Sequence, residues 1–303
     1  MIVADLSVED LTGKLAGRGL RLRTGPVVTE IRSELPAVLR GVALHYADHP
    51  IEDSEGFADF QVCVAPPRGL RRWIRPQVLF QFDGTPPFKP LPAEQAFPIL
   101  EWGLNWCVSS HLHQYLIVHA AVVEKSGCAL LLPAPPGSGK STLCAGLVGR
   151  HWRLLSDELA LIDPATGNVV PLTRPISLKN ASIEVIRRCF SGAVIGPIVH
   201  DTTKGSVAHL KPPTESVRRD KEPAPPRWIV RPRYERGAKA QLTALPKAQA
   251  FMQLAENAFN YSLHGRRGFE LLAQLIDACD CYELTYGELE DALAAVDGMA
   301  RSA

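Results

Sequence analysis

The sequence predicts a mixed α/β protein, of the α/β or α+β class, built from a small β-rich module over residues 1–112 and a larger domain over residues 113–303. In the first part, residues 58–64 and 77–82 alternate apolar and polar side chains, which is typical of half-buried strands. In the second part, an apolar stretch over residues 128–132 leads through a glycine-rich loop into a helical pattern. At 303 residues the chain is long enough for two such domains.

Apolar residues spaced three and four apart predict an amphipathic helix over residues 93–112, with Pro98 in its first turns. We expect this helix to pack across the joint between the two parts. Residues 211–237 contain six prolines and eight Lys or Arg, which predicts a loop or extended arms outside the core. Further strands are expected over residues 115–123, 153–163 and 281–285, and further helices over residues 140–150, 248–260, 266–279 and 287–297.

Composition narrows the classes of function. The chain carries 33 Lys and Arg against 32 Asp and Glu, a net charge of +1, which argues against a globally basic nucleic-acid-binding protein. The longest strongly apolar run is too short for a membrane-spanning helix, and the first ten residues are acidic where a secretory signal would be basic. Seven scattered cysteines predict reduced thiols rather than a disulfide framework. We therefore expect a cytoplasmic protein without membrane contact.

Residues 134–141, Ala-Pro-Pro-Gly-Ser-Gly-Lys-Ser, fit the Walker A phosphate-binding pattern with alanine in place of the first glycine. Gly137 and Gly139 allow the backbone to curl so that its N–H groups point at phosphate oxygens, and a helix that begins at Lys140 directs its positive end at the same place. Lys140 is expected to reach the β- and γ-phosphates, and the Ser141 hydroxyl to bind Mg²⁺. The predicted nucleotide-binding residues are Pro136, Gly137, Ser138, Gly139, Lys140, Ser141 and Thr142.

Asp157, in the next apolar strand, is a second candidate site residue. A carboxylate at this place can hold Mg²⁺ together with Ser141, or accept a proton from the attacking group. The alternative is a charged position on a surface strand. Glu158 is adjacent, and because neighbouring side chains of a strand face opposite ways, we expect only one of the two to point into the site.

These residues resemble the core of bacterial HPr kinase/phosphorylase. A His-Ala pair at residues 119–120, the glycine-rich loop ending in Gly-Lys-Ser, and Gly-Arg-His followed by Ser-Asp-Glu over residues 149–158 correspond there to His-Gly, Gly-Lys-Ser and Arg-Gly-His followed by Ala-Asp-Asp. The chain resembles the HPr kinase-related kinase A family more closely, through the stretches at residues 174–180, 203–213, 255–262 and 279–284.

The resemblance implies a P-loop kinase domain on a scaffold like that of phosphoenolpyruvate carboxykinase. Such a domain uses ATP and Mg²⁺ to phosphorylate a hydroxyl, usually of serine, on a protein or peptide. By position, the resemblance implies Lys140 and Ser141 as phosphate and metal residues, Asp157 as the base that deprotonates the acceptor, and His119 as a catalytic histidine near the phosphates. A hydrogen-bonded core histidine is the alternative for His119. The resemblance also implies a PqqD-like peptide chaperone as a partner, and a homo-oligomer.

The sequence departs from HPr kinase at three points. Ser156-Asp157-Glu158 stands in place of Ala-Asp-Asp, which keeps the base and changes its neighbour. The glutamate motif that supplies a second metal ligand is not recognisable, and Glu184 is the nearest candidate. The loop that docks HPr is absent, which argues against HPr as the acceptor.

Phosphoryl transfer requires in-line positioning and neutralised charge, so a further cation is expected near the substrate. The candidates are Lys204, Arg231 and Arg233, each with a surface charge as its alternative. Arginines and aromatic residues over 227–236 are also compatible with nucleic-acid binding, but acidic residues in the same segment dilute the charge, so no nucleic-acid partner is expected. Two other functions stay open: a nucleotide-gated regulatory or scaffold ATPase that transfers nothing, and a small-molecule kinase.

Overall fold

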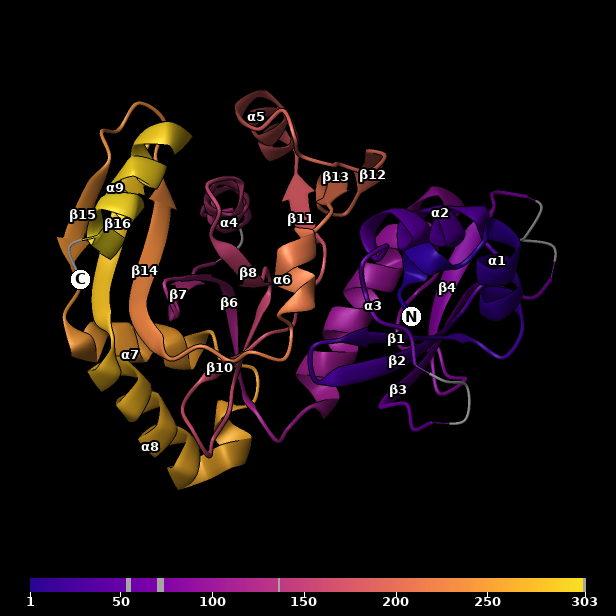
Figure 1. The fold of residues 1–303 in the computed structure, drawn as a ribbon, viewed down its shortest axis with the longest axis horizontal. Coiled ribbons are helices and arrows are strands. Elements are labelled where there is room, and N and C mark those ends of the chain that lie inside the picture. The colour runs from indigo at the N-terminus through magenta and orange to yellow at the C-terminus, as the bar shows by residue number, and fades with distance from the viewer. Residues whose placement is uncertain (53–55, 70–73, 136, 302–303) are drawn as a thin grey trace.

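The computed structural model describes residues 1–52, 56–69, 74–135 and 137–301. This part of the chain is mixed α/β, with three sheets and nine α-helices, as the sequence predicts at the level of fold class. The N-terminal part lies to the right in Figure 1 and the remainder to the left. Among the helices described, none combines the length and the apolar character needed to cross a bilayer. All seven cysteines are free thiols.

The N-terminal part contains a five-stranded sheet in sequence order, in which only the β2–β3 pair is parallel. The predicted strands over 58–64 and 77–82 are confirmed as β3 and β4, whose inward residues alternate with more exposed ones. The bounds are β1 (Leu20–Thr24), β2 (Val27–Arg32), β3 (Phe60–Ala65), β4 (Gln77–Phe82) and β5 (Leu91–Pro92), with helices α1 (Val8–Ala16) and α2 (Pro36–His45) beside the sheet.

The larger part is built on an eight-stranded sheet in the order β10-β9-β6-β7-β14-β16-β15, and β8 pairs with β6 on the same edge as β9. Strand β7 is antiparallel to β6 and parallel to β14, which is parallel to β16. The bounds are β6 (Leu116–Lys125), β7 (Cys128–Pro133), β8 (Arg153–Ser156), β9 (Leu159–Ile162), β10 (Val169–Val170), β14 (Pro226–Tyr234), β15 (Gln241–Ala244) and β16 (Asp280–Tyr286).

The expectation that residues 211–237 form a loop or extended arms outside the core is wrong. The segment contains helix α6 (Thr214–Arg218) and then β14, a central strand whose Trp228, Ile229 and Val230 are all buried. A run of apolar residues buried on both faces is what a parallel strand between two neighbours requires. Pro226 begins the strand and Pro232 lies past the stretch that pairs with β7, where a missing N–H costs little.

Helices cover both faces of this sheet. On one face, α4 and α9 share a core cluster with Trp228 and Val230, whereas α7 and α8 share the opposite cluster with Ile229. The predicted C-terminal helices are confirmed with shifted ends. The bounds are α4 (Lys140–Gly149), α7 (Lys247–Glu256), α8 (Tyr261–Ala278) and α9 (Leu289–Arg301).

A small antiparallel sheet, in the order β11-β13-β12, lies between the large sheet and the N-terminal part (Figure 1). It consists of β11 (Ile176–Lys179), β12 (Val199–Thr202) and β13 (Gly205–Leu210), and helix α5 (Ala181–Cys189) follows β11. Glu184, the nearest candidate for a second metal ligand, lies on α5 and pairs with Arg187 at 2.8 Å on the surface.

The helix predicted over 93–112 is confirmed as a 3₁₀ turn, Ala93–Gln95, followed by α3 (Ala96–His111). It packs across the joint as expected, because Ile117, Leu159 and Leu161 of the larger part share one core cluster with α3. The joint also contains a buried ion pair, in which Arg174 Nη2 donates to Glu101 Oε2 of α3 at 2.7 Å. Asn105 of α3 accepts from the same guanidinium at 2.7 Å.

We predict that Arg174→Met lowers the free energy of unfolding by about 3–5 kcal/mol, because it leaves the Glu101 carboxylate buried without its cation. The measurement is urea unfolding at pH 7. Arg187→Met is the matched control, since its ion pair with Glu184 is exposed and worth less than about 1 kcal/mol. Equal losses in the two variants would contradict the prediction. A double variant, Glu101→Gln with Arg174→Met, should recover part of the loss.

Candidate functional site

The glycine-rich loop joins the end of β7 to the first residue of α4. Gly137 and Gly139 have φ of 87° and 91°, a left-handed region that favours glycine. Two hydrogen bonds from strands β14 and β16 hold the loop. Tyr234 N–H donates to Ser138 O at 3.1 Å, and the Tyr286 hydroxyl donates to Gly139 O at 3.3 Å. A Cβ on Gly139 would lie 2.2 Å from that hydroxyl, so space as well as backbone conformation requires glycine here.

Six of the seven predicted nucleotide-binding residues belong to this strand, loop and helix unit, and Pro136 lies outside the described residues. Lys140 is buried at the start of α4, and Ser141 and Thr142 follow it in the first turn. The free N–H groups at the start of a helix and the left-handed glycines before it are the arrangement that binds phosphate oxygens.

Strand register places His119 at this loop. On one edge of β6, His119 pairs with Leu159 of β9, and its neighbour Ala120 pairs on the other edge with Pro133 at the end of β7. His119 Nε2 therefore lies 2.7 Å from Lys140 Nζ and 3.3 Å from Glu158 Oε2. His119 thus lies beside Lys140, the residue that the sequence predicts to reach the phosphates.

The strand predicted over 153–163 is interrupted by a bend at Asp157 and Glu158, which separates β8 from β9. The expectation that only one of these carboxylates faces the site is wrong, because side chains at a bend do not alternate as they do along a strand. Asp157 Oδ2 accepts from Ser141 Oγ at 3.3 Å and from Ser177 N at 2.9 Å. Glu158 pairs with His119 and, at 3.5 Å, with Lys179 Nζ.

The two carboxylates have opposite electrostatic environments. Burial, together with the charge of Glu158, raises the pKa of Asp157 to about 6. Burial also opposes ionisation of Glu158, but the hydrogen bond from His119 and the charges of Lys140 and Lys179 outweigh it and hold the pKa of Glu158 well below its usual range. Burial lowers the pKa of Lys140, against the attraction of Glu158 and Asp157. Two neighbouring carboxylates with divergent pKa values are typical of acid–base sites.

The side chains fit a magnesium ion. Ser141 supplies a hydroxyl and Asp157 a carboxylate, which are the oxygen ligands that Mg²⁺ prefers. Asp157 Oδ1 is buried and, among the described residues, has no hydrogen-bond partner. The other oxygen, Oδ2, lies beside the Ser141 hydroxyl, where a hard cation could bind both groups, whereas a proton donor would satisfy Oδ1.

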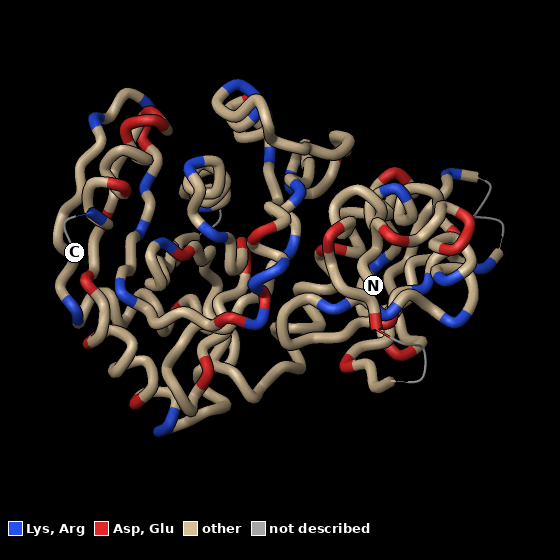
Figure 2. Tube along the Cα trace, in the orientation of Figure 1, with Lys and Arg blue, Asp and Glu red and all other residues tan. Residues whose placement is uncertain are grey.

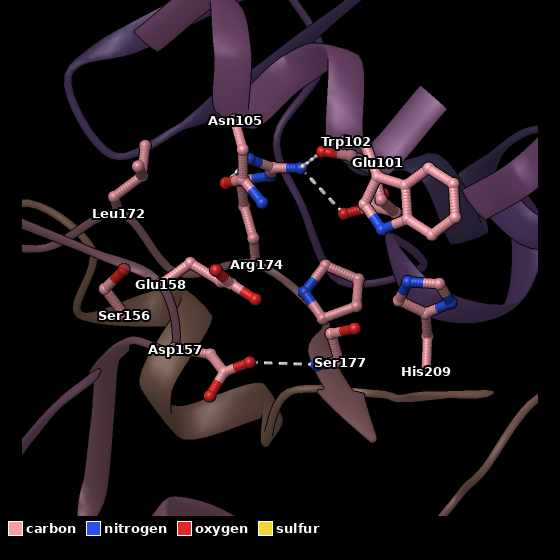
Figure 3. A pocket seen from close by; sticks show the side chains of 11 residues that line it. Glu101, Trp102, Asn105, Ser156, Asp157, Glu158, Leu172, Arg174, Ser177 and His209 are labelled. Atoms are coloured by element: carbon pink, nitrogen blue, oxygen red, sulfur yellow. Dashed lines mark hydrogen bonds and ion pairs between the residues drawn. The ribbon is translucent and has the colours of Figure 1, made fainter. Parts of the chain in front are cut away.

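A small cavity of about 20 Å³ lies beside Asp157 and Glu158, with room for about one or two water molecules. Figure 3 shows α3 of the N-terminal part on one side of it, with Glu101, Trp102 and Asn105, and Ser177 bonded to Asp157 on the other. The N-terminal part therefore contributes directly to the surroundings of the candidate base, through residues that the sequence analysis did not single out.

Of the three predicted substrate cations, Lys204 contacts a side chain that lines this cavity. Its ammonium lies 5.1 Å from the ring centroid of Trp102, which lines the cavity. Burial and the charge of Lys179 lower the pKa of Lys204. Its backbone carbonyl accepts from Asn180 Nδ2 at 3.3 Å, which ties the β12–β13 turn to the end of β11.

Arg231 and Arg233 lie on β14, and both pair with acidic residues of the sheet. Arg231 donates to Glu283 of β16 at 3.0 Å, and Arg233 pairs with Glu235 at 2.6 Å. Basic and acidic positions are likewise interspersed over both parts of the chain (Figure 2). The two arginines thus lie in ion pairs with neighbouring glutamates, at the strand whose end contacts the glycine-rich loop.

Sequence reasoning missed Tyr286 and Trp102 as members of the site. Their contacts come from separate elements, β16 and α3, and no motif connects them in sequence. The position of Glu158 next to Asp157 was a sequence signal for the site. Because a continuous strand was assumed, only one of the two carboxylates was expected to face the site.

No protein family model matches the chain, and no curated protein matches its sequence at a significant level. The chemistry of this site is therefore inferred from its residues and their geometry.

We predict that Asp157→Asn stabilises the metal-free protein at pH 8 by up to about 3 kcal/mol, because the variant has no charge to bury. A carboxyl whose pKa rises from 3.8 to about 6 on folding favours the folded state below pH 3.8 and loses that contribution as pH rises through about 6. The measurement is urea unfolding with EDTA between pH 4 and 8. The difference in unfolding free energy between the wild type and the variant should disappear near pH 4. Unfolding free energies that change with pH in parallel in the two proteins would contradict the raised pKa of Asp157.

Proposed function

We propose that this chain is an ATP-dependent kinase that phosphorylates a hydroxyl, usually of serine, on a protein or peptide acceptor. The observation that carries the proposal is the meeting of Lys140, Ser141 and Asp157 at the end of β7, behind a loop with two left-handed glycines. Phosphoryl transfer depends on positioning and charge stabilisation, and these residues supply both. The proposal places the protein in the cytoplasm, where ATP is available.

The loop and the first turn of α4 would hold the phosphates of ATP through residues 137–142, with Lys140 on the β- and γ-phosphates. Mg²⁺, held by Ser141 and Asp157, would neutralise phosphate charge during transfer. Asp157 has two oxygens with different surroundings: Oδ2 lies beside Ser141, whereas Oδ1 has no partner among the described residues. Asp157 would accept the proton of the acceptor hydroxyl through the oxygen that does not face Ser141.

His119 and Glu158 would position Lys140. The imidazole lies 2.7 Å from the Lys140 ammonium and 3.3 Å from the Glu158 carboxylate, so it bridges the cation and the acid. Lys204, beside Trp102, would contribute positive charge near the acceptor. From the sequence resemblance alone, the proposal extends to a PqqD-like peptide chaperone as a partner and to a homo-oligomer.

One observation favours a second candidate, a nucleotide-gated ATPase that transfers nothing. The cavity beside Asp157 has a volume of about 20 Å³. A water molecule enters a space of this size more readily than part of a folded protein acceptor does. A hydroxymethyl group at the tip of an extended peptide is small enough for the same space. The two candidates differ in which molecule receives the γ-phosphoryl group.

The test is transfer of γ-labelled phosphate from Mg·ATP to an extract of host cells, with the labelled acceptor identified by mass spectrometry. Lys140→Ala and Asp157→Asn should each lower labelling by about 10²–10⁴-fold, as expected for loss of charge stabilisation or of the base. ATP binding should survive in Asp157→Asn.

Lys14→Ala is the control, because Lys14 is exposed on α1 of the N-terminal part. It should label as the wild type does. Release of free phosphate without a labelled acceptor, at equal rates in the wild type and Asp157→Asn, would reject the kinase and support the ATPase.

A further inference from the structure

Lys179, at the end of β11, carries an ammonium group to which the proposed function gives no task. Ser177 and Lys179 are two residues apart, so their side chains leave the same face of this strand. Ile176 and Leu178 leave the other face and join the core cluster that contains α4. Because Ser177 lines the small cavity beside Asp157, Lys179 projects on the side of that cavity.

The backbone at Lys179 is fixed, whereas its ammonium group keeps donors available. Lys179 N–H donates to Ser182 Oγ at 2.8 Å, and the same hydroxyl donates to Lys179 O at 2.7 Å. Among the described residues, the one ion-pair partner of Lys179 Nζ is Glu158 Oε1, at 3.5 Å. An ammonium group has three N–H donors, and their hydrogen bonds are normally about 2.7–3.2 Å long. The side chain is 32% exposed, so a ligand can reach these donors.

Glu158 connects Lys179 to Lys140. Its Oε1 pairs with Lys179, and its Oε2 lies 3.3 Å from His119 Nε2. The same imidazole nitrogen lies 2.7 Å from Lys140 Nζ. The Glu158 carboxylate is therefore flanked by a cation from the glycine-rich loop and a cation from β11.

Positive charge exceeds negative charge among the described side chains around this carboxylate. Three ammonium groups, of Lys140, Lys179 and Lys204, lie around the carboxylates of Asp157 and Glu158. Burial lowers the pKa of Lys140 and that of Lys204, and the charge of Lys179 acts in the same direction on both. Like charges held close together repel each other, and a bound anion relieves this repulsion.

We propose that Lys179 binds the terminal phosphoryl group of ATP, together with Lys140. This inference rests on the proposed kinase function and assigns the further cation that phosphoryl transfer requires. Arg231 and Arg233 are held by ion pairs with glutamates, and Lys204 lies against the ring of Trp102. Lys179 instead shares a carboxylate with the Lys140 cluster and keeps its donors. Negative charge spreads over three outer oxygens of the group in transfer, so cations from two elements stabilise it better than one.

The test measures equilibrium binding of Mg·ADP and of Mg·AMPPNP, a non-hydrolysable ATP analogue, to the full chain by calorimetry. The ratio of the two dissociation constants, ADP over AMPPNP, isolates the contacts to the terminal phosphoryl group. Lys179→Met should lower this ratio by about tenfold, because a charge-assisted hydrogen bond is lost, and should leave the affinity for Mg·ADP unchanged. Lys179→Arg, which keeps the positive charge, should retain part of the ratio.

Lys125→Met is the matched control. Lys125 is also partly exposed, and it lies at the far end of β6, opposite Cys128 at the start of β7. Its removal should leave both affinities unchanged. Glu158→Gln, alone and combined with Lys179→Met, separates a direct contact from an effect through Glu158. The tenfold loss should persist in the Glu158→Gln background.

An unchanged ratio in Lys179→Met, or a loss that disappears in the Glu158→Gln background, would overturn the role of Lys179 and leave the kinase function standing. The expected ratios, without transfer of labelled phosphate to any acceptor, would overturn the kinase function and support Lys179 as a phosphate-binding residue. A wild type that binds neither nucleotide would overturn both.

Discussion

Strand β6 assembles the candidate site because it forms backbone hydrogen bonds along both of its edges. One edge pairs with β7, which leads into the glycine-rich loop, and the other pairs with β8 and β9, which flank the bend at Asp157 and Glu158. A shift of one residue in either register would turn His119 to the opposite face of the sheet. The distances between His119, Lys140 and Glu158 are therefore a consequence of main-chain pairing.

The site concentrates charge where water is largely excluded. Lys140 and Asp157 are both buried, and Glu158 is compensated by His119 and Lys179. Asp157 has only partial compensation, because one of its oxygens has no partner in the described part of the chain. Burying a charge without full pairing costs stability, and proteins retain such groups at sites where a ligand or a proton completes them.

The N-terminal part contributes residues to the surroundings of this site. The Arg174–Glu101 pair and the shared core cluster fix α3 against the larger part, so that Trp102 and Asn105 border the cavity beside Asp157. The same joint forms a second, larger cavity around Gln95, His45 and His209. Both cavities thus require the two parts of the chain together, and a change in their packing would alter the surroundings of the candidate base.

The sequence by itself determined the local elements and the loop. Alternation identified β3 and β4, helical spacing identified α3, and the glycines with Lys140 and Ser141 identified the turn from β7 into α4, because these patterns depend on neighbours in the chain. Tertiary structure decided the rest. The proline-rich segment became central strand β14, since burial between β7 and β16 outweighs local composition. Trp102 and Tyr286 joined the site through contacts between distant segments, which leave no local pattern in the sequence.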